Sequence, residues 1–541
     1  MVKRLLSATM NGLLCASVLA AAAGAAMAAD AKPEQKAEQS VRKEMYLNLY
    51  SEPPTLDPGL GEENLSFAVI RATFDGLTRI GADGQIHPSA AEKIDISNDL
   101  RTYTFHLREA KWSNGDRVTA RDFEYAWKRV LDPRTGANYA YQLYAIKNGK
   151  KVNRGEAKVD DLGIKALDDK TLQVTLEAPT PYFSLLTSFP SYYPVNQKVA
   201  ESNGKWADEA ATHVGNGPFK LESWDHKEKL VLAKNPTYWD KDAVKLDKLH
   251  FTMVEDEYTE FAMFENGELD WAGSPTSSLP YDELLTLRED GKLKTQGIAG
   301  TYWYKFNTEQ APFNNAKIRK AFAYAIDRAS LIHDVLQTNQ IPATAAVPPS
   351  MTLKEGGYFT DHDVTTAKKL LAEGMKESGI TKLPPITLSF NTSEAHKKIA
   401  DEIQSQWKEN LGVDVQLVNK EWKVYMEDLH EGNYQIGRMG WLGDFNDPIN
   451  FLELYKEKDG NNNDTNWENP KYKALLDQSA TEKDPAKRLA ILTEAEQILM
   501  DEMPIMPIYF YTNSWVQDET LQGVVIDGLG YVDFKWASFT N

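Results

Sequence analysis

The residue types that could carry out catalysis are present, but their spacing forms no recognised catalytic or metal-binding motif. The nine histidines stand at positions 87, 106, 213, 226, 250, 333, 362, 396 and 430, with no pair one helical turn apart to hold zinc. The chain has no Gly-x-Ser-x-Gly elbow and no Walker-type phosphate loop, and residues 215–218 lack the third glycine of a dinucleotide fingerprint. The sequence therefore favours a protein that binds a ligand, is not an enzyme and needs no cofactor.

Three other kinds of chemistry have weak or no support. Residues 459–463 begin like a calcium loop but lack its central glycine and the closing glutamate. Cys15 is the only cysteine and lies in a predicted signal peptide, so the mature chain has neither a thiol nucleophile nor a disulfide. A Ser-His-Asp triad assembled from distant positions leaves no trace in spacing, so a secreted hydrolase stays open as an alternative.

Composition indicates a large folded protein. Of 541 residues, 42% are hydrophobic and 26% are charged, which is ordinary for globular chains, and the length suggests three or four domains. The formal net charge of -19 opposes binding to a phosphate backbone, so we expect no nucleic-acid partner.

The first residues have the pattern of a secretory signal. Lys3 and Arg4 precede an apolar run over 13–23, and residues 26–28 form a small-residue cleavage site, which predicts a signal peptide over 1–28 and a flexible leader over 29–43. Later in the chain no run of about 18 uncharged apolar residues follows. The protein is therefore expected to be exported, in the periplasm or cell envelope. A lipid anchor on Cys15 is the weaker alternative, because Leu14 stands where a small residue is usual.

The second half of the chain alternates strands and helices. Apolar periodicity predicts strands over 386–390, 413–418 and 434–441 and helices over 393–412 and 421–430, a β-α-β-α-β order that favours a mostly parallel sheet. Further predictions are strands over 46–50, 103–107 and 508–515, a helix from Thr119 to Asp132, and a long helix over 315–336. In such α/β sheets ligands bind beyond the carboxyl ends of the strands, so loop 443–448 is the expected recognition site.

Several motifs spread over the chain resemble those of the peptide-binding family of extracytoplasmic solute-binding proteins. They are residues 56–58, 112–116, 119–120, 125–129, 215–219, 307–313, 318–322 and 440–448. The resemblance implies an α/β fold of the periplasmic-binding-protein type with three domains, two of which close on a ligand around a hinge. It also implies a protein that captures oligopeptides and delivers them to the membrane permease subunits of an ABC importer. A monomer is the default expectation.

The resemblance implies domain bounds and site residues. Domain I is expected over 44–75, 200–301 and 512–541, domain II over 76–199 and domain III over 302–511. Asp444 stands where the family places the carboxylate that anchors the peptide's amino terminus, and Arg438 and His396 stand where it gathers groups for the peptide carboxylate. Other residues implied to line the peptide site are Glu62, Tyr141, Tyr302, Trp422, Gly440, Trp441 and Tyr511.

Alternatives remain within and outside this family. A receptor for dipeptides, murein peptides, pheromones or a non-peptide solute would share most of these motifs, although an amine-anchoring Asp444 favours a ligand with a free amino terminus. Leu429 occupies a position where similar proteins carry a second arginine, so the handling of short peptides is expected to differ here. A chaperone-like or adhesive surface protein is a third possibility, besides the hydrolase.

Overall fold

The computed structural model describes residues 42–336, 339–460 and 462–540. The predicted signal peptide, its cysteine and nearly all of the leader therefore lie outside the described residues. The first strand begins at Glu44, two residues before the predicted start.

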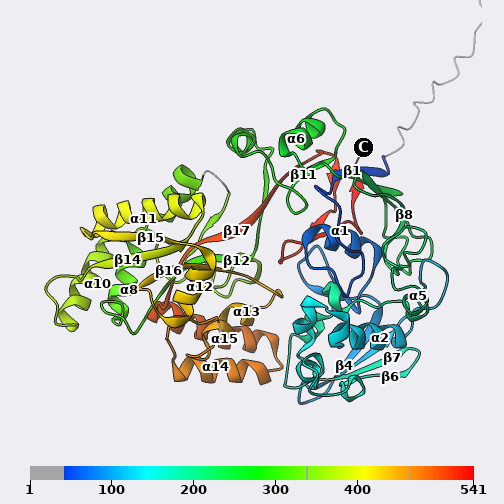
Figure 1. Cartoon of the computed structure of the whole chain (residues 1–541), viewed down its shortest axis with the longest axis horizontal. Coiled ribbons are helices and arrows are strands. Elements are labelled where there is room, and N and C mark those ends of the chain that lie inside the picture. Colours follow the sequence, from blue (N-terminus) through cyan, green and yellow to red (C-terminus); the bar gives the residue numbers. More distant parts are fainter. Residues whose placement is uncertain (1–41, 337–338, 461, 541) are drawn as a thin grey trace, which may run out of the picture. The chain divides into compact units, whose positions relative to one another are not determined.

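An eleven-stranded sheet is the largest element of the fold (Figure 1), with strand order β15-β14-β16-β12-β17-β11-β1-β10-β9-β8 and β13 beside β17. Its strands are β1 (Glu44–Asn48), β8 (Phe219–Asp225), β9 (Lys229–Lys234), β10 (Lys248–Thr252), β11 (Trp271–Gly273), β12 (Lys294–Phe306), β13 (Ile341–Pro342), β14 (Ile386–Asn391), β15 (Val415–Lys420), β16 (Ile436–Leu442) and β17 (Ile505–Gln517). The predicted parallel arrangement holds for β14 with β15 and β16. The expectation of a mostly parallel sheet is wrong for the whole, because β12 and β17 run antiparallel to each other, β12 runs antiparallel to β16, and β8 to β10 form a meander.

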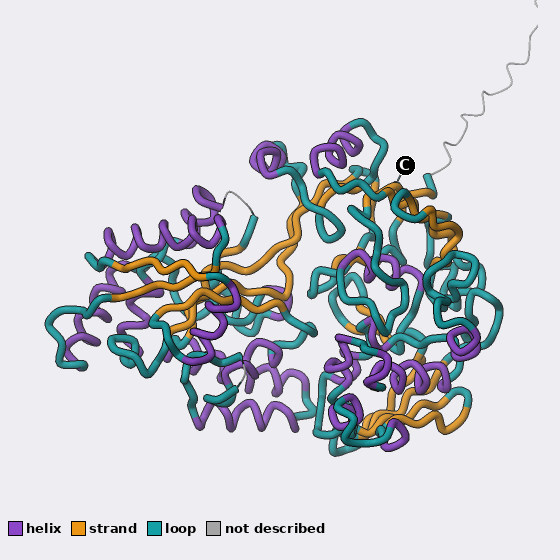
Figure 2. Tube along the Cα trace, viewed as in Figure 1, coloured by secondary structure: helices purple, strands orange, loops and turns teal. Residues whose placement is uncertain are grey.

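Smaller antiparallel sheets complete the strand inventory (Figure 2). They are formed by β4 (Ala91–Ile96), β5 (Thr102–Leu107), β7 (Thr171–Thr175) and β6 (Ile164–Asp168), and by the pairs β2 (Thr78–Ile80) with β3 (Ile86–Pro88), β18 (Leu521–Gln522) with β21 (Ser538–Phe539), and β19 (Val525–Ile526) with β20 (Val532–Asp533). In β5 the side chains of Tyr103, Phe105 and Leu107 are buried and those between them are half-buried, which is the predicted alternation.

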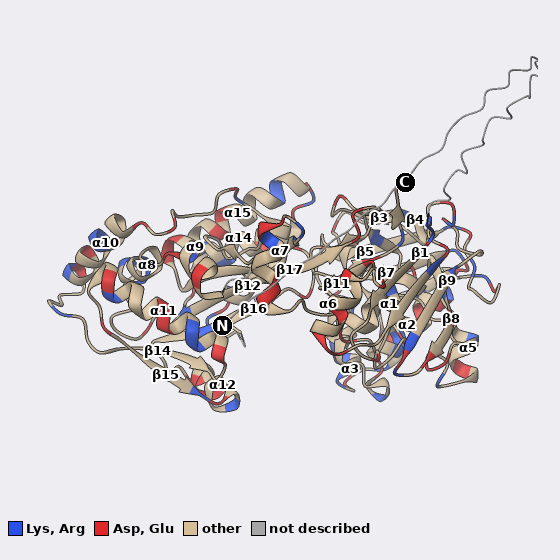
Figure 3. Ribbon diagram, turned by 90° about the horizontal axis from the view of Figure 1, so that it is seen from above, with Lys and Arg blue, Asp and Glu red and all other residues tan. Residues whose placement is uncertain are grey.

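Helices flank these sheets. They are α1 (Asn64–Thr73), α2 (Ala120–Leu131), α3 (Gly149–Asn153), α4 (Phe183–Leu186), α5 (Gln197–Ser202), α6 (Glu257–Glu265), α7 (Leu284–Glu289), α8 (Ala316–Tyr324), α9 (Arg328–Ser330), α10 (Val364–Glu377), α11 (Glu394–Leu411), α12 (Trp422–Glu431), α13 (Ile449–Leu452), α14 (Pro470–Thr481) and α15 (Pro485–Glu502). Short 3-10 turns are η1 (Pro133–Thr135), η2 (Asn138–Leu143), η3 (Val159–Asp161), η4 (Pro190–Tyr192), η5 (Tyr281–Glu283), η7 (Pro349–Met351) and η8 (Glu453–Tyr455), and η6 (Leu331–Leu336) is a π-helix. Acidic and basic side chains are interspersed along many of these helices (Figure 3).

Local sequence accounts for the bounds of several helices. The carboxylate of Asp122 accepts hydrogen bonds from the backbone N–H (2.8 Å) and hydroxyl (3.0 Å) of Thr119, which starts α2 at the predicted place. The hydroxyl of Ser393 accepts from the N–H of His396 (3.4 Å), and α11 ends where Gly412 takes the left-handed φ of 70°.

The predicted long helix over 315–336 is wrong, because the chain breaks into α8, α9 and η6. The break lies at Asp327, whose N–H donates to the side chain of Gln406 (2.7 Å) and whose carboxylate caps α9 by accepting from the N–H of Ser330 (2.9 Å). The tertiary contact with Gln406 and the local cap at Ser330 replace the hydrogen bonds that a continuous helix would have made here.

Buried apolar side chains form two large clusters. One draws on residues 45–271 and 521–539, and the other draws on residues 299–509. The strands β12 and β17, thirteen residues each, pair along most of their length and extend between the two groups of residues. The three-domain bounds given above stay a prediction.

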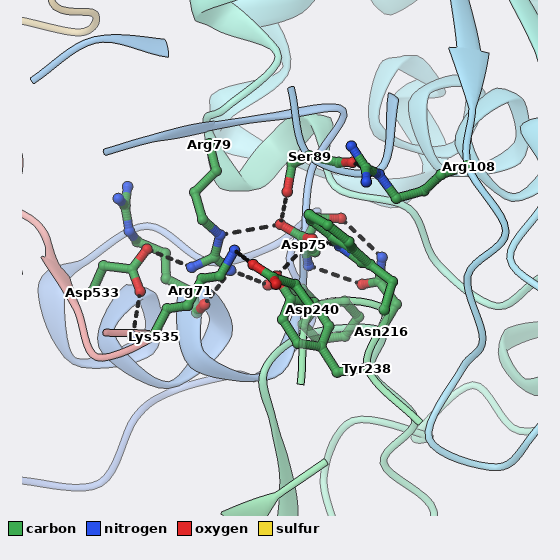
Figure 4. A network of polar contacts seen from close by, with 12 residues as sticks. Arg71, Asp75, Arg79, Ser89, Arg108, Asn216, Tyr238, Asp240, Asp533 and Lys535 are labelled. Carbon is green, nitrogen blue, oxygen red and sulfur yellow. Dashed lines mark hydrogen bonds and ion pairs between the residues drawn. The ribbon is translucent and has the colours of Figure 1, made fainter. Parts of the chain in front are cut away.

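A network of buried ion pairs fastens the C-terminal segment to α1 and β2 (Figure 4). Arg71 lies 2.8 Å from the carboxylate of Asp527, and Arg79 pairs with both Asp75 (3.1 Å) and Asp533. All five side chains are at least 96% buried, so each charge depends on its partner to offset the loss of water.

His213 is buried in the first cluster without a polar partner. Its ring lies 5.4 Å from that of Phe74 and 5.8 Å from that of Trp206, and neither ring nitrogen has a hydrogen-bond partner among the described residues. Burial lowers the pKa of His213 from 6.5 to about 4. The unfolded chain therefore takes up a proton first as the pH falls.

We predict that His213→Phe flattens the pH dependence of stability. In the native protein, stability is lost as the pH falls from about 6.5 through about 4, by on the order of 3 kcal/mol at the lower end. Calorimetry at pH 7 and pH 4.5 should show a smaller drop in unfolding temperature for His213→Phe than for the native chain. The same substitution at the exposed His87 is the control, and an equal drop in all three proteins would contradict the assignment.

Candidate functional site

The strand β16 and the loop that follows it hold four of the predicted site residues, Arg438, Gly440, Trp441 and Asp444. Arg438 and Gly440 lie on one face of β16, opposite Tyr304 and Tyr302 of β12. Across β12, Tyr302 pairs with Tyr509 of β17, and the two rings stack at 4.7 Å. One face of the sheet therefore carries tyrosine rings with a single arginine among them.

Arg438 is a half-buried cation without an anionic partner. Its guanidinium carbon lies 4.6 Å from the centroid of the Tyr302 ring, and Nη1 donates to the side chain of Asn391 at 3.3 Å. Its buried Nε has no hydrogen-bond partner, and no carboxylate is among the groups that act on its charge within the described residues. Burial lowers the pKa of Arg438, but Tyr302 and Tyr511 outweigh that effect and the net shift is upward. A charged guanidinium in this setting is suited to receive an anion.

His396 lies beside this arginine, in the first turn of α11. Its Nδ1 is 3.3 Å from the hydroxyl of Tyr302. Burial, with a smaller contribution from the charge of Arg438, lowers the pKa of His396 from 6.5 to about 4. The ring is therefore neutral near pH 7, and it supplies a hydrogen bond here rather than a second positive charge.

Asp444 is a carboxylate whose recorded side-chain partner is a neutral hydroxyl. The hydroxyl of Tyr141 donates to its Oδ1 at 3.0 Å, and the amide of Gln142 donates to its backbone oxygen at 3.1 Å. Burial raises the pKa of Asp444, while the hydrogen bond from Tyr141 opposes that rise. No basic side chain is among the groups that act on the Asp444 carboxylate within the part of the chain that the structure describes. A cation brought to this carboxylate would complete the pair.

The loop that carries Asp444 is tied to its surroundings on both sides. Phe445 stacks on Tyr182 at 4.9 Å, and the carboxylate of Asp447 makes two hydrogen bonds with Arg488, at 2.7 and 2.8 Å. The side chain of Asn450 accepts from the indole N–H of Trp441 (2.8 Å) and from the N–H of Asp444 (3.2 Å). Phe445 and Asp447 lie in the predicted recognition loop, but none of these supporting roles was predicted, because each acts through a contact that spacing does not record.

The other predicted residues differ in how deeply they are buried and in what they contact. Tyr302 is fully buried, so its part in the site is to hold Arg438 and His396. Tyr511 is half-buried, and a Cβ added at Gly440 would lie 3.2 Å from its hydroxyl. Glycine at 440 thus leaves room for a tyrosine of the site itself.

Glu62 and Trp422 are both exposed. Glu62 accepts a hydrogen bond from Asn138 (2.7 Å), and it acts with Asp444 to raise the pKa of Tyr139, after burial as the main cause. Trp422 begins α12, is 47% exposed, and has no recorded contact with Asp444 or Arg438. Leu429 lies fully buried beside Tyr425 and Tyr434, below the surface of the site.

The two unpaired charges are set apart by the strand itself. From Arg438 to the end of β16 at Leu442 the chain rises by about 13 Å, at roughly 3.3 Å per residue, and Asp444 follows two residues later. The site therefore combines a positive end, a wall of tyrosine rings and a negative end. No group of three or more metal-ligating side chains occurs within the described ranges.

Comparison with known proteins decides the family. The model of the bacterial extracellular solute-binding proteins, family 5, matches residues 85–463. The chain belongs to this family. The resemblance inferred from the motifs and the α/β fold are thereby confirmed.

Relatives match over nearly the full length. The oligopeptide-binding protein OppA of Bacillus subtilis is 54% identical over 514 residues, which cover 94% of each chain. Among solved structures, the unliganded open form of the murein tripeptide-binding protein MppA gives a TM-score of 0.86 at 34% identity and covers 92% of this chain and 97% of that one. Listeria monocytogenes OppA bound to peptide gives 0.64 at 33% identity, covering 92% and 99%.

No helix in the described part of the chain combines the length and apolar character that a membrane crossing requires.

We predict that Arg438→Gln raises the pKa of His396. Removing the guanidinium removes the charge that opposes protonation, while burial remains, so the new value should lie between about 4 and 6.5. An NMR titration of the histidine ring protons, with His396→Gln for assignment, measures it. Lys397→Gln, at an exposed neighbouring position, should leave the titration unchanged. A pKa that stays the same or falls in Arg438→Gln would show that the two groups do not interact.

Proposed function

We propose that this family member is an exported, monomeric receptor that captures oligopeptides and delivers them to the permease of an ABC importer, without catalysis. Three relatives support peptides as ligands by their names: OppA and the dipeptide-binding protein DppE of Bacillus subtilis, and the murein peptide-binding protein MppA of Escherichia coli. Another relative is named as a probable deoxycholate-binding protein, so the ligand class needs a direct test.

The observation that carries the proposal is the pair of opposite charges without ionic partners, one on β16 and the other in the loop that follows this strand. A peptide in solution has an ammonium group and a carboxylate joined by an extended backbone. Asp444 is suited to the ammonium and Arg438 to the carboxylate, because each group is partly buried and no oppositely charged side chain acts on it among the described residues. We assign His396 to the same carboxylate, as a neutral hydrogen-bonding group.

The wall between the charges suits a ligand that varies in sequence. Tyrosine rings offer broad apolar contact, and their hydroxyls offer hydrogen bonds that need no particular partner. We assign Tyr511 to the wall of the peptide site and the buried Tyr302 to the support of Arg438 and His396 behind that wall. Glu62, Tyr141 and Trp441 are assigned to the amino-terminal end, and Trp422 to a side-chain pocket. Gly440 is assigned to the stretch where the peptide backbone approaches the strand.

Capture and release require that the ligand bind one arrangement of the protein better than another. A peptide that contacts Asp444 and also residues such as Glu62 on the α1 side would make more contacts when these regions approach each other, and this difference would favour the closed form. Delivery to a permease then depends on recognition of that form.

We predict that Asp444→Ala weakens binding of peptides with a free amino terminus by about 2–5 kcal/mol, because the buried ammonium loses its partner. Acetylated peptides should bind the native protein weakly and the variant almost equally. Because burial raises the pKa of Asp444, affinity for free amines should also fall as the pH drops through that raised value. Isothermal titration calorimetry measures all three effects.

Asp477→Asn, at an exposed position, is the matched control, and this variant should bind peptides like the native protein. Mass spectrometry of the peptide after incubation tests the hydrolase alternative, since a receptor returns the peptide intact. Binding of deoxycholate but of no peptide would contradict the proposed function. Unchanged affinity for free-amine peptides in Asp444→Ala would contradict the role of Asp444 as the amine anchor.

A further inference from the structure

Asn450 makes a contact that joins two parts of the candidate site. It is the second residue of α13 and its side chain is only 7% exposed. Its Oδ1 accepts from the indole N–H of Trp441 at 2.8 Å and from the backbone N–H of Asp444 at 3.2 Å. An amide oxygen has two lone pairs, and both are used here.

The position of Asn450 is fixed by the core, whereas Trp441 and Asp444 are half-exposed. The helix α13 begins after Pro448, and the N–H of Ile449 donates to the carboxylate of Asp447 at 3.0 Å. Ile449, Phe451 and Leu452, the other residues of α13, are buried in the second cluster. The carboxylate of Asp447 is in turn held by two hydrogen bonds from Arg488.

We propose that Asn450 is a positioning residue that sets the Trp441 ring and the Asp444 loop at a fixed relation to each other. This inference rests on the proposed function, because the two groups would meet the first residue of the peptide: the carboxylate its ammonium and the indole its side chain. Asn450 itself contacts neither the ammonium nor the side chain of the peptide. It determines whether one ligand residue can satisfy both groups at once, and it therefore supports selection for a free amino terminus.

The physical reason is the loss that follows when the shared acceptor is removed. The indole N–H and the N–H of Asp444 would both need water or another acceptor. Without the shared acceptor, nothing at Asn450 holds the ring and the loop in one relation, and each is free to turn toward a different partner. The hydrogen bond between the carboxylate and an ammonium depends on geometry, so a shift of the Asp444 loop weakens it.

The test is Asn450→Leu, which keeps the size of the side chain and removes the acceptor. Calorimetry with a free-amine peptide and its acetylated form should show a loss of about tenfold for the free amine and less than about threefold for the acetylated peptide. In a Trp441→Phe background, which already lacks the indole N–H, Asn450→Leu should cause a clearly smaller loss. Additive effects in this double-mutant cycle would overturn the coupling.

A matched control separates positioning from general loss of stability. Asn307 is a 98% buried amide that donates to the backbone oxygen of Gly432 (2.9 Å) and has no recorded contact with the site. Asn307→Leu should lower the unfolding temperature and leave the ratio of the two peptide affinities unchanged. If Asn307→Leu lowers that ratio as much as Asn450→Leu does, or if Asn450→Leu leaves it unchanged, the positioning role is wrong.

One readout needs no peptide and keeps this inference separate from the proposed function. The indole N–H resonance of Trp441, assigned through Trp441→Phe, should move in Asn450→Leu because its acceptor is gone, and it should stay in place in Asn307→Leu. Native protein that binds no peptide would reject the proposed function while this resonance still reports on the Asn450 contact. An unmoved resonance in Asn450→Leu would reject the contact itself.

Discussion

The pairing of β12 with β17 is the constraint on which the rest of the site depends. β12 also pairs with β16, so the register between these strands fixes where Arg438 lies relative to the tyrosine rings. The register shifts between Gly297 and Thr301, and within this irregular stretch Ala299 uses both of its backbone groups: its oxygen accepts from Gly443 and its N–H donates to Gly528, both at 2.6 Å. The start of the loop that carries Asp444 is thus bonded to the same strand that places Arg438.

Buried charges near the C-terminal segment and charges at the candidate site differ in their partners. Arg71 and Arg79 are almost completely buried and meet carboxylates of the C-terminal segment, so their charges are compensated within the fold. Arg438 and Asp444 are less buried, and no oppositely charged side chain acts on either among the described residues. Holding unpaired charges in partly dry surroundings opposes folding. Arg319 and Glu496 are also buried without an ion pair in the described part of the chain, but several backbone groups and, for Glu496, a tyrosine hydroxyl satisfy them. Arg438 and Asp444 have fewer such internal partners, which fits charges that meet a ligand.

Local sequence predicted the elements near the site well, since the caps at Thr119 and Ser393 and the stop at Gly412 act within a few residues. Prediction from local sequence failed where contacts with distant segments decide the structure. The helix expected over 315–336 breaks because Asp327 contacts Gln406, and the sheet is mixed because β17 returns from the far end of the chain. The charged ends of the site were available from motif resemblance, whereas Asn391, Gln142, Tyr182 and Asn450 were not, since polar residues that support a site follow no periodic pattern.

Neutral groups orient Asp444, whereas a charged pair holds the loop that carries it. A carboxylate that must accept a cation cannot also be held by a strong internal ion pair, because that pair would compete with the ligand. Its orientation has to come from neutral groups and from the backbone. The hydroxyl of Tyr141 and the shared acceptor of Asn450 meet this requirement, while the charged pair of Asp447 and Arg488 is kept three residues away, where it stiffens the loop without neutralising the anchor. A site for a charged ligand can thus be rigid and still keep its own charge unpaired.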